Sequence, residues 1–185
     1  MISTESLRKD HDLIEKVLKA MDVTLQLLKN GKKIPESILL HTLDFAKNFV
    51  DICHHGKEED SLFPELEKRG MPTHIGPIAT MLMEHKQTRE IAERMTLSSK
   101  EYLQSGSAEK LISDITQYIE HMAKHIWKEN NRLFVMAEMR LKGYADQMNK
   151  SLDDVEKQKL QQIGKRRDDY EKLVADLEQN LSKLN

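Results

Sequence analysis

The fold of this 185-residue chain is decided by the stretch HHGKEEDSLFPELEKRG, residues 54–70. Its central feature is a His-x-x-x-Glu pair, His54 and Glu58, whose members lie one turn apart on the same face of a helix. A second copy of the pattern occurs at His125 and Glu129, and Leu-Phe follows a few residues after each copy. Two helices therefore each present an imidazole and a carboxylate from one face.

Two further histidines lie on the other two long helical segments of the sequence. His11 belongs to the first segment and His85 to the third. A carboxylate or an imidazole inside an apolar bundle is costly unless it is paired, hydrogen-bonded or coordinated to a metal. The six groups on four helices therefore predict a dinuclear metal site, in which each ion takes two histidines and the two glutamates bridge the ions.

Hydrophobic periodicity predicts long helices over residues 3–30, 35–70, 77–104 and 108–143. Each carries apolar residues at spacings of three and four, the pattern of one buried stripe. Pro64 removes a backbone donor, so we expect the second helix to kink or to end its regular part there. The predicted fold class is all-α, a four-helix bundle with one or two extra C-terminal helices.

The doubled histidine must be assigned to the two faces of the second helix. At about 100° per residue, His54 aligns with Val50 on the apolar stripe, so we expect His54 and Glu58 to point inward. His55 aligns instead with Asp51, and we expect it to point outward. His41 and His74 are also expected at the surface or in loops.

Composition and charge exclude several classes of function. The net charge is −2 with both signs interspersed, so there is no electrostatic case for binding nucleic acid or an anionic membrane. No apolar run is long enough to cross a bilayer, and the N-terminal residues lack the hydrophobic region of a signal peptide. The single cysteine, Cys53, rules out an intramolecular disulfide. We therefore expect a cytoplasmic protein.

We divide the chain into a metal-binding bundle, residues 1–143, and a C-terminal extension, residues 144–185. The extension is polar and charged, with apolar residues at loosely helical spacing, and no histidine follows His125. We expect it to form one or two helices that pack on the bundle or on a partner. The sequence leaves open whether the extension binds a protein partner or forms a homodimer.

The ligand types narrow the choice of metal. Imidazole and carboxylate without thiolate suit iron, manganese or zinc better than Cu(I) or an iron–sulfur cluster. Two divalent ions are only partly neutralised by two glutamates, which invites an oxo, hydroxo or exogenous ligand. We expect two iron ions with such a bridge, and zinc and manganese are the alternatives. Ferritin-like bundles use Glu-x-x-His instead, so that family fits poorly.

Four motifs carry a more specific signal. They are His11-Asp-Leu-Ile, His54-His-Gly-Lys-Glu58-Glu-x-x-Leu-Phe-Pro, Glu84-His85 and His125-Ile-x-Lys-Glu129-x-x-x-Leu-Phe. Over residues 1–143 they resemble the hemerythrin-like, or HHE cation-binding, family. The resemblance implies an up-down four-helix bundle that holds a non-haem di-iron centre. It implies terminal ligands from four histidines and bridges from two glutamates: His11, His54, His85, His125, Glu58 and Glu129.

One departure from the family pattern bears on function. Oxygen-carrying members use His-x-x-x-His on the third helix and His-x-x-x-x-Asp on the fourth. Here Met81 and Arg89 lie one turn from His85, and the fourth helix has His-x-x-x-Glu. The five-histidine set is incomplete, which favours redox chemistry or sensing over oxygen transport. His121 lies one turn before His125, at the edge of the apolar stripe. Whether it partly compensates for the missing histidine stays open.

The leading functional hypothesis is a di-iron protein that binds or reacts with a small oxidant, namely O2, NO or peroxide. Its context would be sensing, detoxification or iron-centre repair, and the sequence leaves open whether the protein turns over a substrate. The alternative is metal storage or donation, or a metal-stabilised signalling module without turnover. Tyr118, two turns from His125, is expected to pack rather than to react.

Overall fold

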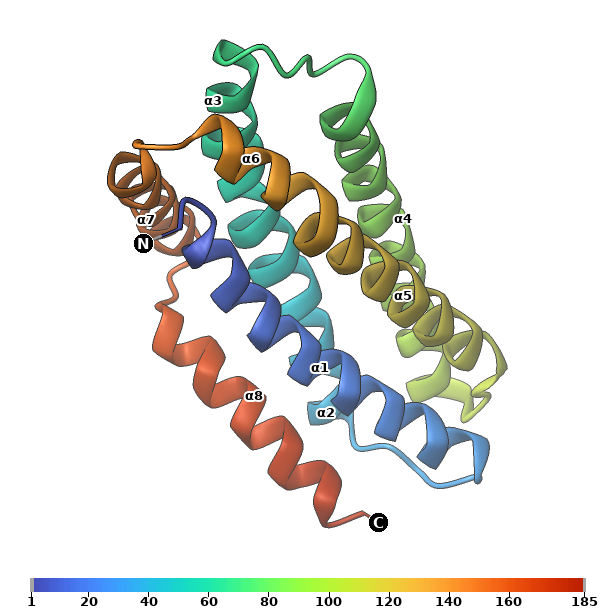
Figure 1. Cartoon of the computed structure of the whole chain (residues 1–185). Coiled ribbons are helices and arrows are strands. Elements are labelled where there is room, and N and C mark those ends of the chain that lie inside the picture. The colour runs from blue at the N-terminus through green and yellow to red at the C-terminus, as the bar shows by residue number, and fades with distance from the viewer. Residues whose placement is uncertain (1, 185) are drawn as a thin grey trace.

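The computed structural model describes residues 2–184 and is helical throughout its regular parts (Figure 1). In chain order the helices are α1 (Glu5–Lys29), α2 (Glu36–Asp44), η1 (Phe45–His55), η2 (Glu58–Leu62), α3 (Phe63–Lys68), α4 (Gly76–Ser105), α5 (Glu109–Lys128), η3 (Glu129–Leu133), α6 (Phe134–Arg140), α7 (Ala145–Gln162) and α8 (Arg167–Ser182). Segments marked η are π-helical, with i→i+5 hydrogen bonds and a wider turn than the α-helix.

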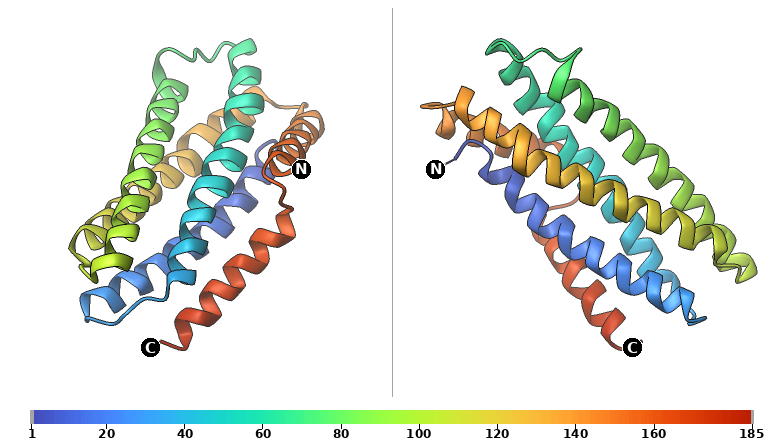
Figure 2. Two further views of the ribbon diagram at one scale, coloured as in Figure 1. Left: turned by 180° about the vertical axis from the view of Figure 1, so that it is seen from behind. Right: turned by 45° about the vertical axis from the view of Figure 1, so that its right-hand side comes forward.

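Four long helices run up and down to form a bundle (Figures 1 and 2). The second runs without a break from α2 through η1 and η2 to α3, and the fourth runs from α5 through η3 to α6. Helix α1 lies against α5 and η1, and α4 lies against the same two elements on the other side. The predicted all-α bundle is confirmed, and no strand occurs within residues 2–184.

The type of helix changes next to Pro64, where we expected the second helix to kink or to end its regular part. Instead of ending the helix, Pro64 lies in the first turn of α3, directly after η2. A missing N–H costs little at the first turn of a helix. The helix therefore continues to Lys68, and the chain turns at Gly70, whose φ is +83°. None of the helices within residues 2–184 is long and apolar enough to cross a bilayer.

The hydrophobic core has two parts with the predicted ligands between them. On α1, Leu7 belongs to the smaller cluster and Ile14 to the larger, and His11 lies between these two residues. On the second helix the larger cluster ends at Cys53 and the smaller begins at Leu62. A polar layer therefore crosses the bundle and divides its core.

The C-terminal extension packs on the bundle. Leu152 on α7 is buried in the smaller cluster, whereas Leu177 on α8 is buried in the larger. The ring of Tyr170, also on α8, lies on Phe45 and Phe49 of η1, with ring centroids 6.0 Å and 5.3 Å away. Aromatic rings at these distances contribute beyond the area they bury. The extension thus shares the core of the bundle.

The shared core predicts that α8 unfolds together with the bundle. Leu177→Ala should lower the free energy of unfolding by about 2–5 kcal/mol, as for other buried leucines, and should shift one common transition in chemical denaturation. The control is Glu178→Ala, because Glu178 is the exposed neighbour. An unchanged main transition, or a separate early one, would show that α8 is not part of the cooperative unit.

Candidate metal centre

All six residues predicted as ligands meet in the polar layer, and their side chains are buried. Glu129 is central: its Oε2 lies 3.1 Å from Nε2 of His11, and its Oε1 lies 3.2 Å from Nε2 of His125. Glu58 Oε2 is 3.2 Å from Nε2 of His85. Nε2 atoms from several helices therefore face one another across the two glutamates.

The other nitrogen of each predicted histidine is held by a polar side chain. The Nδ1 contacts are His11 to Asn130 at 2.9 Å, His54 to Asp10 at 3.1 Å, His85 to Glu59 at 2.7 Å and His125 to Glu84 at 3.0 Å. Because each partner offers an acceptor oxygen, Nδ1–H donates and Nε2 points into the layer. This arrangement fixes the tautomer and the ring orientation of metal-binding histidines.

The inward-facing atoms fit a metal better than they fit one another. Both oxygens of Glu58 and Glu129, and Nε2 of His85 and His125, have no hydrogen-bond partner in the described part of the chain. Their short contacts do not have hydrogen-bond geometry, although buried polar atoms are normally paired. Divalent cations satisfy such a set of carboxylates and imidazoles. The donor set thus fits a cation-binding site.

These ligand atoms fall into two groups that share Glu129. One group contains His11 and His54, and the other contains Glu58, His85 and His125. Within each group the candidate ligand atoms lie within 4.8 Å of one another. A carboxylate common to both groups is placed to bridge two ions.

Charges in the layer favour an ionised Glu129. Burial would raise the pKa of Glu129, but the adjacent His125 and His11 hold it well below its usual range. Burial would likewise lower the pKa of His125, but Glu129 and Glu84 raise it to about 9. A divalent cation bound by His125 would therefore replace a proton that this imidazole carries in its absence, while Glu129 remains charged.

A buried ion network joins His54 to the C-terminal extension. Asp10 Oδ2 accepts from Lys57 Nζ at 2.6 Å, and its Oδ1 accepts from Arg167 at 2.8 Å. The same two cations contact Glu156 Oε2, at 2.7 Å and 2.9 Å. Burial would raise the pKa of Asp10, but Lys57 and its other partners, His54 and Arg167, lower it far below its usual value. An ionised carboxylate therefore holds the His54 ring.

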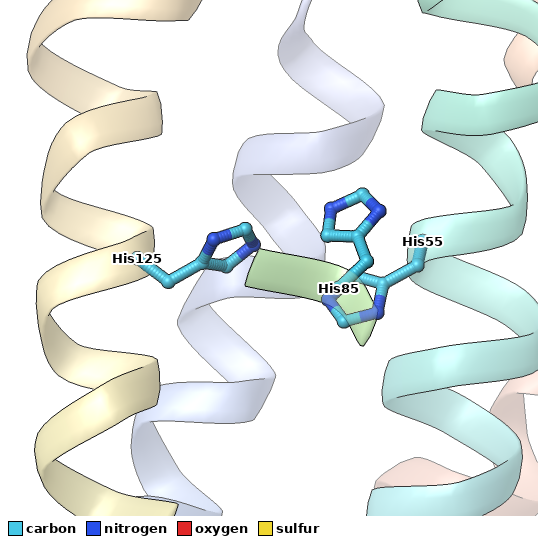
Figure 3. A group of neighbouring side chains, drawn as sticks. All are labelled: His55, His85 and His125. Carbon is cyan, nitrogen blue, oxygen red and sulfur yellow. The ribbon is translucent and has the colours of Figure 1, made fainter. Parts of the chain in front are cut away.

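His55 is the residue that the sequence analysis misplaced. The helical-wheel count predicted an outward side chain, whereas His55 is fully buried. It lies at the end of η1, where the wider π turn rotates each residue by less than the α-helix does, so His54 and His55 both reach the interior. Figure 3 shows His55 beside His85 and His125 in the space between the helices.

The remaining histidines do not belong to the groups of candidate ligand atoms. His121 is half-buried, and its Nε2 lies 2.9 Å from the Thr88 hydroxyl and 3.1 Å from the carbonyl oxygen of Glu84. His41 is also half-buried, and His74 is exposed in the loop before α4.

Two other side chains from the sequence analysis are fully buried. Tyr118 belongs to the larger hydrophobic cluster, as expected for a packing residue. Cys53 lies in the same cluster, and burial raises its thiol pKa to about 12. Its thiol is therefore protonated at neutral pH.

The Asp10 contact predicts a specific effect on metal affinity. Asp10→Asn removes the charge that orients His54, and loss of such an outer partner lowers metal affinity roughly 10- to 100-fold. The measurement is a Co²⁺ titration of full-length protein against a chelator, with melting of the metal-free variant to verify its fold. Asp12→Asn, at an exposed neighbouring position, is the control. Equal affinities in both variants would exclude a role for Asp10 at the site.

Sequence comparisons agree with this geometry. A family model described as the hemerythrin HHE cation binding domain matches residues 3–137. Uncharacterized proteins of Mycobacterium bovis and of two strains of Mycobacterium tuberculosis are 21% identical over 132 residues, which cover 70% of this chain and 51% of theirs. The chain thus spans about half the length of these curated relatives. No solved structure matches the chain. The family match covers most of the bundle, and the chain belongs to the hemerythrin HHE cation-binding family.

Proposed function

We propose that this protein holds two iron ions and binds or reacts with a small oxidant, namely O2, NO or peroxide. The observation that carries the proposal is the convergence of buried histidine nitrogens on two glutamates whose oxygens have no other partner in the described chain. Bound iron would supply redox chemistry toward such an oxidant. The protein would act in sensing, detoxification or iron-centre repair.

Each ligand residue has a distinct task in this proposal. His11 and His54 would hold one ion, and His85 and His125 the other. Glu129 would bridge them, because its two oxygens contact His11 on one side and His125 on the other. Glu58 would be the second bridge. The charge of the two glutamates offsets part of the cationic charge in a layer that excludes water.

The residues behind the histidines would keep protons in place. Glu84 accepts from Nδ1 of His125 and also pairs with Lys128. Burial would raise the pKa of Glu84, but these two partners lower it to about 2. The carboxylate therefore stays ionised at neutral pH. It would keep one proton of His125 on Nδ1, so that Nε2 is the nitrogen that gives up its proton and binds metal.

The enclosure of the site favours a small ligand. The proposed ligand side chains are at most 2% exposed, so a large substrate cannot reach them without movement of the helices. Two surface grooves approach the layer from opposite sides. One, of about 450 Å³, lies between the second helix and α4 beside the Asp51–Arg89 ion pair. The other, of about 690 Å³, lies between α1 and α5 and reaches Asn130, the partner of His11.

A metal-holding role without turnover is the second candidate. The observation that favours it is the buried Asp10–Lys57–Glu156–Arg167 network, which would keep one side of the site rigid. Imidazole and carboxylate ligands also suit zinc. In this case the C-terminal extension would serve a protein partner that responds to the metal, and the site would not change with oxidants.

The glutamate bridges give the central test. Anaerobically purified protein should contain about two irons per chain, and Glu129→Ala should lose most of both, since Glu129 contacts both groups of histidines. Glu58→Ala should have a similar effect. His74→Ala should keep the wild-type content, because His74 is exposed and lies outside the site. Elemental analysis of each variant, with its far-ultraviolet circular dichroism, measures the effect.

Air exposure separates the two candidate functions. An absorption spectrum of the iron-loaded protein should gain a near-ultraviolet band in air and should change again with NO or peroxide. Zinc in the purified protein, or a spectrum indifferent to all three oxidants, would contradict the redox proposal and favour the metal-holding role.

A further inference from the structure

His55 is a fully buried histidine that the proposed ligand set does not use. Both of its ring nitrogens have no hydrogen-bond partner within residues 2–184. The nearest carboxylate, Asp51, lies 3.6 Å from Nδ1, beyond hydrogen-bond length. An apolar side chain would fill this space without the cost of burying two unpaired nitrogens. The choice of histidine here therefore requires an explanation other than packing.

The neighbours of His55 supply that explanation. Its ring stacks on His85 with centroids 3.8 Å apart, and it meets the edge of His125 at 5.4 Å. Each of the three histidines offers a ligand nitrogen, and these atoms lie within 4.8 Å of one another. The three rings come from η1, α4 and α5 and gather in one space between the helices (Figure 3). Three imidazoles from three helices can surround one ion.

We propose that His55 is a third nitrogen ligand of the metal ion held by His85 and His125. The inference rests on the proposed metal site and adds a residue to it. Asp51 lies near Nδ1 of His55. In the same way, Glu59 lies at Nδ1 of His85 and Glu84 at Nδ1 of His125. Because the His55 ring stacks in parallel on His85, it would have to turn for one of its nitrogens to reach the shared ligand position.

The third ligand makes the two metal positions unequal. The position of His11 and His54 has two imidazoles, whereas the position of His85 and His125 has three. Geometry and ligand count determine the properties of a bound metal. The missing histidine on α4, where Met81 and Arg89 flank His85 at one turn, is thus replaced by a histidine from the second helix.

The test uses full-length protein loaded anaerobically with ⁵⁷Fe. Wild type should give two Mössbauer doublets of equal area, one for each position. His55→Phe keeps an aromatic ring stacked on His85 but offers no nitrogen. This variant should bind the iron of the His85–His125 position at least about 10-fold more weakly, since loss of even an outer partner has this effect. Its doublet should shift or disappear while the other remains.

A cavity variant adds a rescue experiment. In His55→Ala, added imidazole should occupy the space and restore the second doublet. His121→Ala is the matched control, because His121 is also near His125, with ring centroids 6.2 Å apart, but lies outside the ligand groups. Melting curves of the metal-free variants establish that each is folded.

The outcomes separate this inference from the proposed function. Two unchanged doublets with wild-type affinity in His55→Phe would overturn the role of His55 and leave the di-iron proposal standing. Wild-type protein that binds no iron pair would overturn both. A loss in His55→Phe that imidazole does not restore in the folded His55→Ala variant would assign His55 to packing and also reject its role as a ligand.

Discussion

The structure depends on the placement of ionisable side chains in one buried layer across a four-helix bundle. Burying them is costly, and each of the four long bundle helices contributes both to the layer and to the apolar clusters on either side of it. Outer partners hold each of the four predicted histidines at Nδ1, and two cations balance Asp10. The core has two parts because this polar layer separates the apolar clusters on its two sides.

Helix periodicity and the repeated His-x-x-x-Glu pattern were enough to predict the bundle and the six residues that meet in the layer. His55 was assigned to the wrong face because the helical wheel assumes α-helical geometry, and η1 is π-helical. The wider turn depends on tertiary packing that periodicity does not encode. The sequence analysis also missed the side chains that hold Nδ1 of the four predicted histidines. Each of these side chains is adjacent in sequence to a predicted ligand, as Asp10 is to His11. Each supports a histidine of another helix, which spacing along one helix cannot reveal.

The extension changes how the domain should be delimited. The family match ends at residue 137, before α7 begins. Glu156 and Arg167, however, complete the ion network around Asp10, and Leu177 lies in the larger core cluster. We expected residues 144–185 to pack on the bundle or on a partner, and the structure shows them on the bundle. They lie outside the matched region and yet contact Asp10, which holds a histidine of the site.

The ion network has a thermodynamic consequence for this arrangement. Arg167 and Asp10 join α8 to the residue that orients His54, so attachment of the extension and metal affinity are linked equilibria. This linkage is reciprocal. If bound metal increases the affinity of the extension for the bundle by some factor, a docked extension increases the affinity of the site for metal by the same factor. A protein that captures α8 would weaken the hold on the ion by this factor. Loss of the metal would in turn weaken the attachment of α8 by the same factor.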